Sequence, residues 1–312
     1  MRKTFVEEIT ALAKEDEKIM MLMGDIGNLI FDDFDEQFPG RFQNCGIAEQ
    51  EMVGVAAGLS FQGFKPVVYT IASFMTARCL EQIKIDLCYH NANVVVLGGG
   101  GGLTYASLGG THHSTDDIGM LSVLPDMTIV CPGDPVEMRM ALRALLKRGG
   151  PSYLRFGRSG EPVVYDEEYD FQIGKAHELF CGVDVCILST GNILPEAVKA
   201  VEKFSEMGNR VGLCSFHTVK PLDHEMIFSL AKRYNVLVTV EEHNLNGGFG
   251  SLVSSFITDN GVDVGLMRIA VPDVFIHGAN SQKLAREMVG LDSESIVERI
   301  LKCRDEYWER ER

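Results

Sequence analysis

Hydrophobic residues at the start of the chain recur at the spacing of a helix. Phe5, Ile9 and Leu12 lie three or four positions apart, which places their side chains on one face and predicts an amphipathic helix. The next apolar run, residues 20–23, is followed by Gly24 and is typical of a buried strand that ends in a turn. Strand and helix patterns then alternate along the first half of the chain.

This alternation continues to about residue 156. Strands are expected at residues 66–72, 93–97, 127–131 and 152–156, and helices at residues 49–62, 74–91 and 134–147. The strand runs are apolar on both faces, so helices should cover both sides of the sheet. The pattern predicts an α/β domain with a mainly parallel sheet.

The pattern changes after residue 157, where glycine and proline precede the acidic run 166–170. Such a stretch is typical of a surface connection between domains. A second alternation follows, with strands expected at residues 183–188, 210–215, 235–240 and 264–271, and helices at residues 194–207 and from 293 onward. We therefore predict two doubly wound α/β domains, residues 1–165 and 181–312, joined by a linker at residues 166–180.

Composition agrees with two packed domains and argues against some classes of binding partner. The chain has 312 residues, of which 46% are apolar, a length typical of two domains. A net charge of −15 argues against nucleic acid or an anionic membrane as the main partner. No run of roughly 18 apolar residues occurs, so no membrane span is expected. The eight cysteines form no C-x-x-C pair, which favours reduced thiols in a cytoplasmic protein.

One carboxylate stands between a glycine turn and an apolar helix, in the segment Gly-Ile-Ala-Glu-Gln at residues 46–50. A glutamate at a helix start is commonly a cap or is favoured by the helix dipole, and that is the alternative to a functional role for Glu49. The helix that follows is apolar almost all round, and Gly54 and Gly58 leave a strip that another backbone can approach. We expect this helix to be buried, either within the chain or at a subunit contact. A carboxylate in such surroundings suits proton exchange with a ligand.

Five consecutive glycines, residues 98–102, follow the third predicted strand. They lack the pattern of a phosphate-binding P-loop or of a dinucleotide fingerprint, so a flexible loop at the carboxyl edge of the sheet is the simpler interpretation. Active sites of α/β proteins nevertheless lie at that edge. His112 and His113 come shortly after, and adjacent side chains diverge too much to share a metal. We predict no metal site here, and a proton donor in a glycine-walled pocket instead.

Two further segments carry charged residues at the ends of strands. Arg155 and Arg158 are either solvated surface residues or a clamp for a substrate phosphate. The segment Glu-Glu-His-Asn at 241–244, followed by glycines, is either catalytic or a turn that closes the second domain against its neighbour. We favour the turn.

In this order, these segments resemble the transketolase family of thiamine-diphosphate enzymes, which includes 1-deoxyxylulose-5-phosphate synthase. Residues 46–50 are similar to the synthase motif glycine-x-alanine-glutamate-glutamine, and Thr-His-His at 111–113 is similar to the family's Thr-His-Gln. Residues 151–158 resemble the strand that carries the phosphate-binding arginine. Residues 219–223 and 240–243 resemble the C-terminal domain of the family. The resemblance implies a pyrimidine-binding domain followed by a transketolase C-terminal domain.

The resemblance implies three residues that face the cofactor. Glu49 would be catalytic and would hydrogen-bond N1′ of the aminopyrimidine, which promotes loss of the proton from C2 of the thiazolium. Phe74 would stack on the aminopyrimidine, and Asp25 would lie near the cofactor at a subunit interface. The second and third aromatics that follow in transketolases are absent, because Ala77 and Leu80 occupy those spacings.

Other residues would face the substrate. His112 matches the catalytic histidine that contacts substrate oxygens, His113 takes the place of the family's glutamine, and Arg158 matches the arginine that holds the sugar phosphate. The aspartate that reads a substrate hydroxyl in transketolases falls on Leu108 here, with Ser107 one position away. Loss of a buried residue that hydrogen-bonds a substrate hydroxyl changes which sugar is accepted.

In the transketolase family, a Gly-Asp-Gly motif followed by an Asn holds Mg²⁺ and the diphosphate in a diphosphate-binding domain. Here the only near-match is residues 24–27, and it lies in the part that corresponds to the pyrimidine-binding domain. The resemblance therefore implies the C-terminal subunit of a split transketolase. It would transfer a two-carbon ketol unit from a ketose, phosphorylated or modified, to an aldose. A separate N-terminal subunit would hold most of the thiamine diphosphate and Mg²⁺, in a homodimer of heterodimers.

Two alternatives remain open from the sequence. One is a subunit of an acyl-transferring thiamine-diphosphate enzyme, like deoxyxylulose-phosphate synthase or the β subunit of a 2-oxo acid dehydrogenase. The other is a non-catalytic scaffold with the same fold, against which the presence of both Glu49 and His112 argues.

Overall fold

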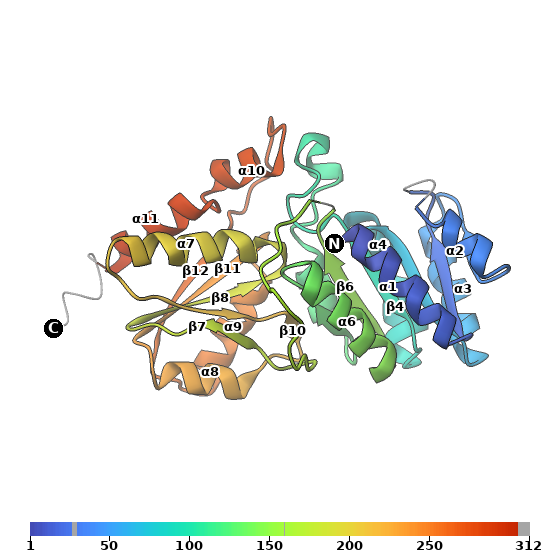
Figure 1. Cartoon of the computed structure of the whole chain (residues 1–312), viewed down its shortest axis with the longest axis horizontal. Coiled ribbons are helices and arrows are strands. Elements are labelled where there is room, and N and C mark those ends of the chain that lie inside the picture. The colour runs from blue at the N-terminus through green and yellow to red at the C-terminus, as the bar shows by residue number, and fades with distance from the viewer. Residues whose placement is uncertain (27–29, 159, 305–312) are drawn as a thin grey trace.

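The structure is a computed structural model that describes residues 1–26, 30–158 and 160–304. Two α/β units lie side by side, each with helices packed on its sheet (Figure 1). The N-terminal unit is built on a sheet of seven strands and the C-terminal unit on a sheet of five. This confirms the predicted fold class of two α/β domains with mainly parallel sheets.

The seven-stranded sheet has the order β10-β5-β6-β4-β3-β1-β2. Its strands are β1 (Ile19–Met23), β2 (Phe42–Asn44), β3 (Lys65–Ile71), β4 (Val95–Gly99), β5 (Thr128–Val130), β6 (Ser152–Phe156) and β10 (Thr218–Lys220). All neighbouring strands are parallel except β10, which runs antiparallel to β5. Since β10 comes from the C-terminal half of the chain, the second domain completes the sheet of the first.

Helices cover both faces of this sheet. They are α1 (Arg2–Glu15), α2 (Asp32–Gln37), α3 (Glu49–Phe61), α4 (Ala72–Gln82), a π-helical continuation η1 (Ile83–Tyr89), the 3₁₀ segment η2 (Ala106–Thr111), α5 (Asp117–Ser122) and α6 (Pro135–Arg148). Along β3, Val67 and Tyr69 belong to the buried cluster that includes α1 and α6, whereas Val68 belongs to the cluster that includes α3 and α4. Successive side chains of a strand point to opposite faces, so an unbroken apolar run becomes buried on both.

The five-stranded sheet has the order β12-β11-β8-β9-β7, parallel except for β7. Its strands are β7 (His177–Phe180), β8 (Val185–Thr190), β9 (Gly212–Ser215), β11 (Val236–Asn244) and β12 (Gly265–Val271). Its helices are η3 (Gly191–Ile193), α7 (Leu194–Glu206), α8 (His224–Ala231), α9 (Phe249–Asp259), α10 (Gln282–Val289) and α11 (Ser293–Cys303). Figure 1 shows α7 and α11 on one face and α8 and α9 on the other.

The strand β7 falls within residues 166–180, the segment expected to connect the two domains. It pairs antiparallel with β9, so its residues belong to the second sheet. Within the described residues, no helix is long and apolar enough to cross a membrane.

Candidate active site

The carboxyl edge of the first sheet brings together residues from separate segments. Glu49 begins α3, Phe74 lies in the first turn of α4 after β3, and His112 follows η2. The buried strands fix where these segments start, as expected for a site of an α/β protein.

Glu49 is a buried carboxylate, with only 2% of its surface exposed. It is the first residue of α3, where the partial positive charge of the helix N-terminus favours an anion. Arg78 Nη1 donates a hydrogen bond to its carboxylate at 2.7 Å. A Cβ at Gly24 would lie 3.4 Å from Glu49 Cγ and 3.2 Å from the hydroxyl oxygen of Thr70, so glycine allows β1 to approach closely.

The Thr70 hydroxyl is buried and has no hydrogen-bond partner among the described residues. Buried polar atoms are ordinarily bonded, and an orphan needs a physical reason. Its position beside Gly24 places it next to Glu49. A polar ligand bound beside Glu49 would supply the hydrogen-bond partner that the Thr70 hydroxyl lacks.

Arg78, Phe74 and His112 continue from Glu49 as a chain of contacts. The guanidinium carbon of Arg78 lies 4.5 Å from the centroid of the Phe74 ring, a cation–π contact. The Phe74 and His112 ring centroids are 5.1 Å apart at 63°. The structure therefore brings together the predicted residues Glu49, Phe74 and His112.

His112 faces the loop that precedes it. Its Nδ1 lies 2.9 Å from the Thr111 hydroxyl, and its ring is 6.1 Å from the ring of Tyr105. Partial burial, with a further contribution from His113, lowers the pKa of His112 below 6.5. The neutral imidazole thus predominates at neutral pH and can accept or donate a proton.

His113 does not join this group. It is buried, and its Nε2 lies 3.2 Å from the carbonyl oxygen of Ala106, so that nitrogen carries the proton. Leu108, in place of the family's aspartate, is half exposed on η2.

Arg155, within β6, and Arg158, just after it, differ in burial and in partners. Arg155 is buried, and its guanidinium donates to Asp117 at 2.7 Å. Arg155 therefore stabilises the fold rather than facing a ligand. Burial raises the pKa of Asp117, but the charges of Arg155 and His243 and the hydrogen bonds from Arg155 and Tyr153 together lower it below its usual value. Arg158 is exposed, lies 5.5 Å from the Tyr105 ring, and makes no ion pair with any described residue. It lines a cavity of about 260 Å³ between the domains.

Asp25 is tied to the turn before Glu49. Its Oδ1 accepts a hydrogen bond from Asn44 Nδ2 at 3.0 Å, and Asn44 Oδ1 accepts one from the Gly46 amide at 2.9 Å. Asp25 has a positive φ of 28° and is exposed at the end of β1. Gly27, the last residue of the near-match to the diphosphate motif, lies outside the described residues.

These residues fit one end of thiamine diphosphate. A buried carboxylate, an orphan hydroxyl and an aromatic ring suit an aminopyrimidine, which has ring nitrogens and a flat face. Within residues 1–26, 30–158 and 160–304, no group of three or more His, Cys, Asp or Glu is arranged to hold a metal.

Comparison with known proteins decides the family. The family model described as "Transketolase, pyrimidine binding domain" matches residues 1–162. The one described as "Transketolase, C-terminal domain" matches residues 174–296. The chain belongs to the transketolase family.

Transketolase relatives differ in how much of their length the chain covers. It is 37% identical to one of the subunits of the apulose-4-phosphate transketolase of Phocaeicola vulgatus, and the match covers 96% of both chains. It is 35% identical to the 1-deoxy-D-xylulose-5-phosphate synthase of Shouchella clausii, but covers 48% of that protein. A solved structure described as a split gene transketolase in an inactive beta4 tetramer aligns with a TM-score of 0.86 and 30% identity, over 96% of each chain. The predicted family is confirmed, and a transketolase assembled from separate subunits is the form that matches at full length.

Sequence reasoning missed Arg78, Thr70 and Tyr105. Arg78 lies four positions after Phe74 in α4, and this helical spacing is a signal that would have found it. Thr70 and Tyr105 carry no comparable signal, because their importance comes from contacts between distant segments.

Proposed function

We propose that this chain is the pyrimidine-side subunit of a split transketolase, and that it transfers a two-carbon ketol unit from a ketose to an aldose. The observation that carries the proposal is the buried Glu49 carboxylate beside an orphan Thr70 hydroxyl. Full-length similarity to a single subunit of a transketolase supports this activity over that of the synthase, which is about twice as long.

Thiamine diphosphate, when bound, supplies a carbon nucleophile and an electron sink. Glu49 would hold a nitrogen of the aminopyrimidine and exchange a proton with it, and Phe74 would hold the flat face of the ring. Asp25 would orient the turn that leads to Glu49 at a subunit boundary. Because Glu49 is removed from water, its interaction with a ligand is stronger than it would be at the surface.

On the substrate side, His112 would hold or move a proton at a sugar oxygen. Its lowered pKa keeps it neutral, so it can act in either direction near neutral pH. Arg158 would bind the phosphate of the sugar, since its guanidinium is exposed in a cavity and has no carboxylate partner among the described residues. His113 would support the loop from inside rather than touch the substrate.

A partner subunit would supply the diphosphate and Mg²⁺ site. The exposed face of α3 supports assembly. Val55 and Phe61 on α3 are 48% and 55% exposed, and Ile47 just before the helix is 81% exposed. No atom lies within 4 Å of a Cβ built at Gly54 or Gly58. Apolar residues gathered around a strip of small ones form an interaction surface. We propose a homodimer of heterodimers that buries this face.

One alternative remains an acyl-transferring activity of the synthase type. It is favoured by the 35% identity to a synthase over 95% of this chain and by Leu108, which replaces the hydroxyl-reading aspartate of transketolases. A cytoplasmic location also remains a prediction, which the absence of any C-x-x-C pair among the eight cysteines supports.

The test is reconstitution with the partner subunit, thiamine diphosphate and Mg²⁺, followed by a panel of donors. We expect ketol transfer from a ketose phosphate to an aldose phosphate, and none from this chain without its partner. Turnover of pyruvate, with none of any ketose phosphate, would overturn the proposal in favour of the acyl-transferring alternative.

A further inference from the structure

The second domain has the strand order at which doubly wound folds form a ligand crevice. Its chain order reverses between β8 and β11, because β8 continues to β9 on one side and β11 lies on the other. In such sheets ligands bind at the carboxyl ends of the strands where the order reverses. Asn192 follows β8, and Glu242 lies near the end of β11.

The first domain's glycine loop occupies this crevice. The amide of Leu103 donates to Glu242 Oε2 at 3.2 Å. Gly102 has a φ of +65°, and a Cβ there would lie 2.6 Å from Glu242 Cβ, so only glycine allows the approach. The loop therefore lies at the position where doubly wound folds bind their ligands.

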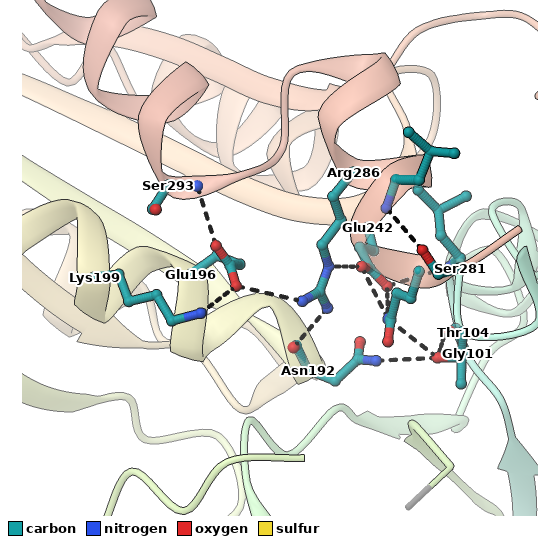
Figure 2. Close-up of polar contacts among 12 residues, drawn as sticks. Gly101, Thr104, Asn192, Glu196, Lys199, Glu242, Ser281, Arg286 and Ser293 are labelled. Carbon is teal, nitrogen blue, oxygen red and sulfur yellow. Dashed lines mark hydrogen bonds and ion pairs between the residues drawn. The ribbon is translucent and has the colours of Figure 1, made fainter. Parts of the chain in front are cut away.

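Thr104 adds a second set of contacts, shown in Figure 2. Its hydroxyl donates to the Gly101 carbonyl at 2.7 Å. It accepts from Asn192 Nδ2 at 3.1 Å and from Gln282 Nε2 at 3.4 Å. Both donors belong to the second domain, one after β8 and one at the start of α10.

The charge of Glu242 is fully buried and is matched from α10. Arg286 Nε donates to Glu242 Oε1, and Arg286 Nη2 donates to the Asn192 carbonyl at 2.9 Å. Gln282 Nε2 lies 3.1 and 3.0 Å from the two carboxylate oxygens. A buried carboxylate costs stability unless it is paired and hydrogen-bonded, so this set acts as one unit.

The far end of the same loop is held at the same residue. Arg155 Nη2 donates to the carbonyls of Ser114 and Glu242, both at 2.9 Å. Gly102 and Ser114 exchange backbone hydrogen bonds at 2.9 and 3.0 Å. The Glu242 carboxylate therefore holds the Leu103 end of residues 103–113, the loop that carries His112, and the Glu242 backbone carbonyl shares Arg155 with Ser114 at the other end.

We propose that Glu242 is a positioning residue and that the second domain uses its ligand crevice to hold the loop 103–113. The inference rests on the proposed function, because the loop matters to catalysis through His112. Its consequence is that sugar binding depends on a carboxylate in the other domain that does not line the site itself.

The test compares Glu242→Gln with Glu178→Gln in the complex with the partner subunit. Glu178 is a matched control, since its carboxylate accepts from Arg233 at 2.8 and 3.1 Å at the opposite edge of the same sheet. In Glu242→Gln one of the surrounding donors meets an NH₂ group, which cannot accept. We expect KM for the sugar to rise roughly tenfold, with a smaller change in kcat. We also expect faster hydrogen exchange in residues 103–113 and an unchanged affinity for thiamine diphosphate.

Three outcomes decide the matter. If Glu242→Gln matches Glu178→Gln in KM and in loop exchange, the proposal is overturned. If Glu242→Gln does not fold, Gln282→Met, which removes one neutral donor to Glu242, is expected to speed hydrogen exchange in residues 103–113 on a smaller scale; hydrogen exchange decides here rather than KM, because Gln282 also lines the cavity of Arg158. If the unaltered complex transfers no ketol unit, the proposed function fails, and hydrogen exchange still shows whether Glu242 holds the loop.

Discussion

Arg78 holds the Glu49 carboxylate through a hydrogen bond of 2.7 Å, and its side chain is 43% exposed whereas that of Glu49 is 3% exposed. The pair therefore joins a buried acid to the solvent boundary of the site. The same guanidinium lies over Phe74. One arginine thus fixes the two side chains proposed to face the cofactor.

Replacing Glu49 by glutamine should abolish most activity. Glutamine fills the same space but cannot exchange a proton, so we expect kcat of the complex to fall by roughly 10² to 10⁴. Glu51→Gln is the control, because Glu51 is exposed on the same helix. Initial rates with both variants check this, and a Glu49→Gln complex within threefold of the unaltered rate would contradict the role.

Arg78→Met should weaken cofactor use. Loss of the guanidinium frees both Glu49 and Phe74, so we expect the thiamine diphosphate concentration for half-maximal activity to rise about tenfold, as for loss of one charged hydrogen bond. Arg78→Lys keeps the charge but loses the planar contact and should lie in between. Titration of activity with cofactor measures this. Equal half-saturation in all three proteins would mean that Arg78 plays no part in cofactor binding.

Arg158→Leu should discriminate between sugars by their phosphate. We expect KM for a phosphorylated sugar to rise roughly 10- to 100-fold, because a hydrogen bond to a charged group contributes about 1.5–3 kcal/mol. KM for the matching unphosphorylated sugar should stay the same. Arg148→Leu, at an exposed position on α6, is the control. A similar rise for both sugars would contradict phosphate binding by Arg158.

Gly58→Leu should break assembly without harming the subunit. A Cβ at Gly58 meets no atom within 4 Å, so the folded chain has room for the side chain. Leucine also favours a helix more than glycine does, by about 0.8 kcal/mol. We expect sedimentation to show half the mass of the unaltered complex, with the subunit's own melting temperature kept. A complex of full mass would show that another face makes the contact. Lys283→Leu, on exposed α10, controls for added hydrophobicity.

His217 should make the chain sensitive to acid. Burial, with His177 nearby, lowers its pKa from 6.5 to about 3, while the unfolded chain keeps the ordinary value. Between these values only the unfolded state binds the proton, so stability falls as pH falls below 6.5, by about 1.4 kcal/mol per pH unit. His217→Phe keeps the stacking on Phe171, whose ring is 4.0 Å away, and should remove this part of the pH dependence.

Denaturant midpoints at pH 7 and pH 5 measure the effect. The difference between the two midpoints should shrink in His217→Phe. It should stay in the control His224→Phe, which is exposed and stacks on Phe256. Equal differences in all three proteins would mean that His217 does not cause the acid sensitivity.

Sequence patterns predicted the helices and strands that are determined by residues close together in the chain. Long apolar strands and the apolar helix after Glu49 were predicted because an apolar run bounded by turn residues is visible within the segment itself. The grouping of Glu49, Phe74 and His112 followed from the family motif order, and their contacts agree with it. Contacts between distant segments gave no such signal. Thr70 became notable only when its hydroxyl was seen to lack a partner, and the ion pair of Arg78 with Glu49 joins two helices.

Short elements were not predicted from the sequence for a related reason. The strand β10 has three residues, too few to show a period, and its pairing depends on β5, some ninety positions earlier. His113 and Arg155 were both grouped with functional residues by sequence position. Their side chains turn inward, because one bonds Ala106 and the other bonds Asp117.

The antiparallel pairing of β10 with β5 also limits where the enzyme can be divided into separate chains. A chain that ended near residue 165 would lack β10 and leave the edge of β5 open, with unpaired backbone groups that attract other strands. The two domains of this chain are therefore expected to be inherited and expressed together. Any division of the enzyme that keeps the pyrimidine-binding and C-terminal domains in one chain leaves this shared sheet intact.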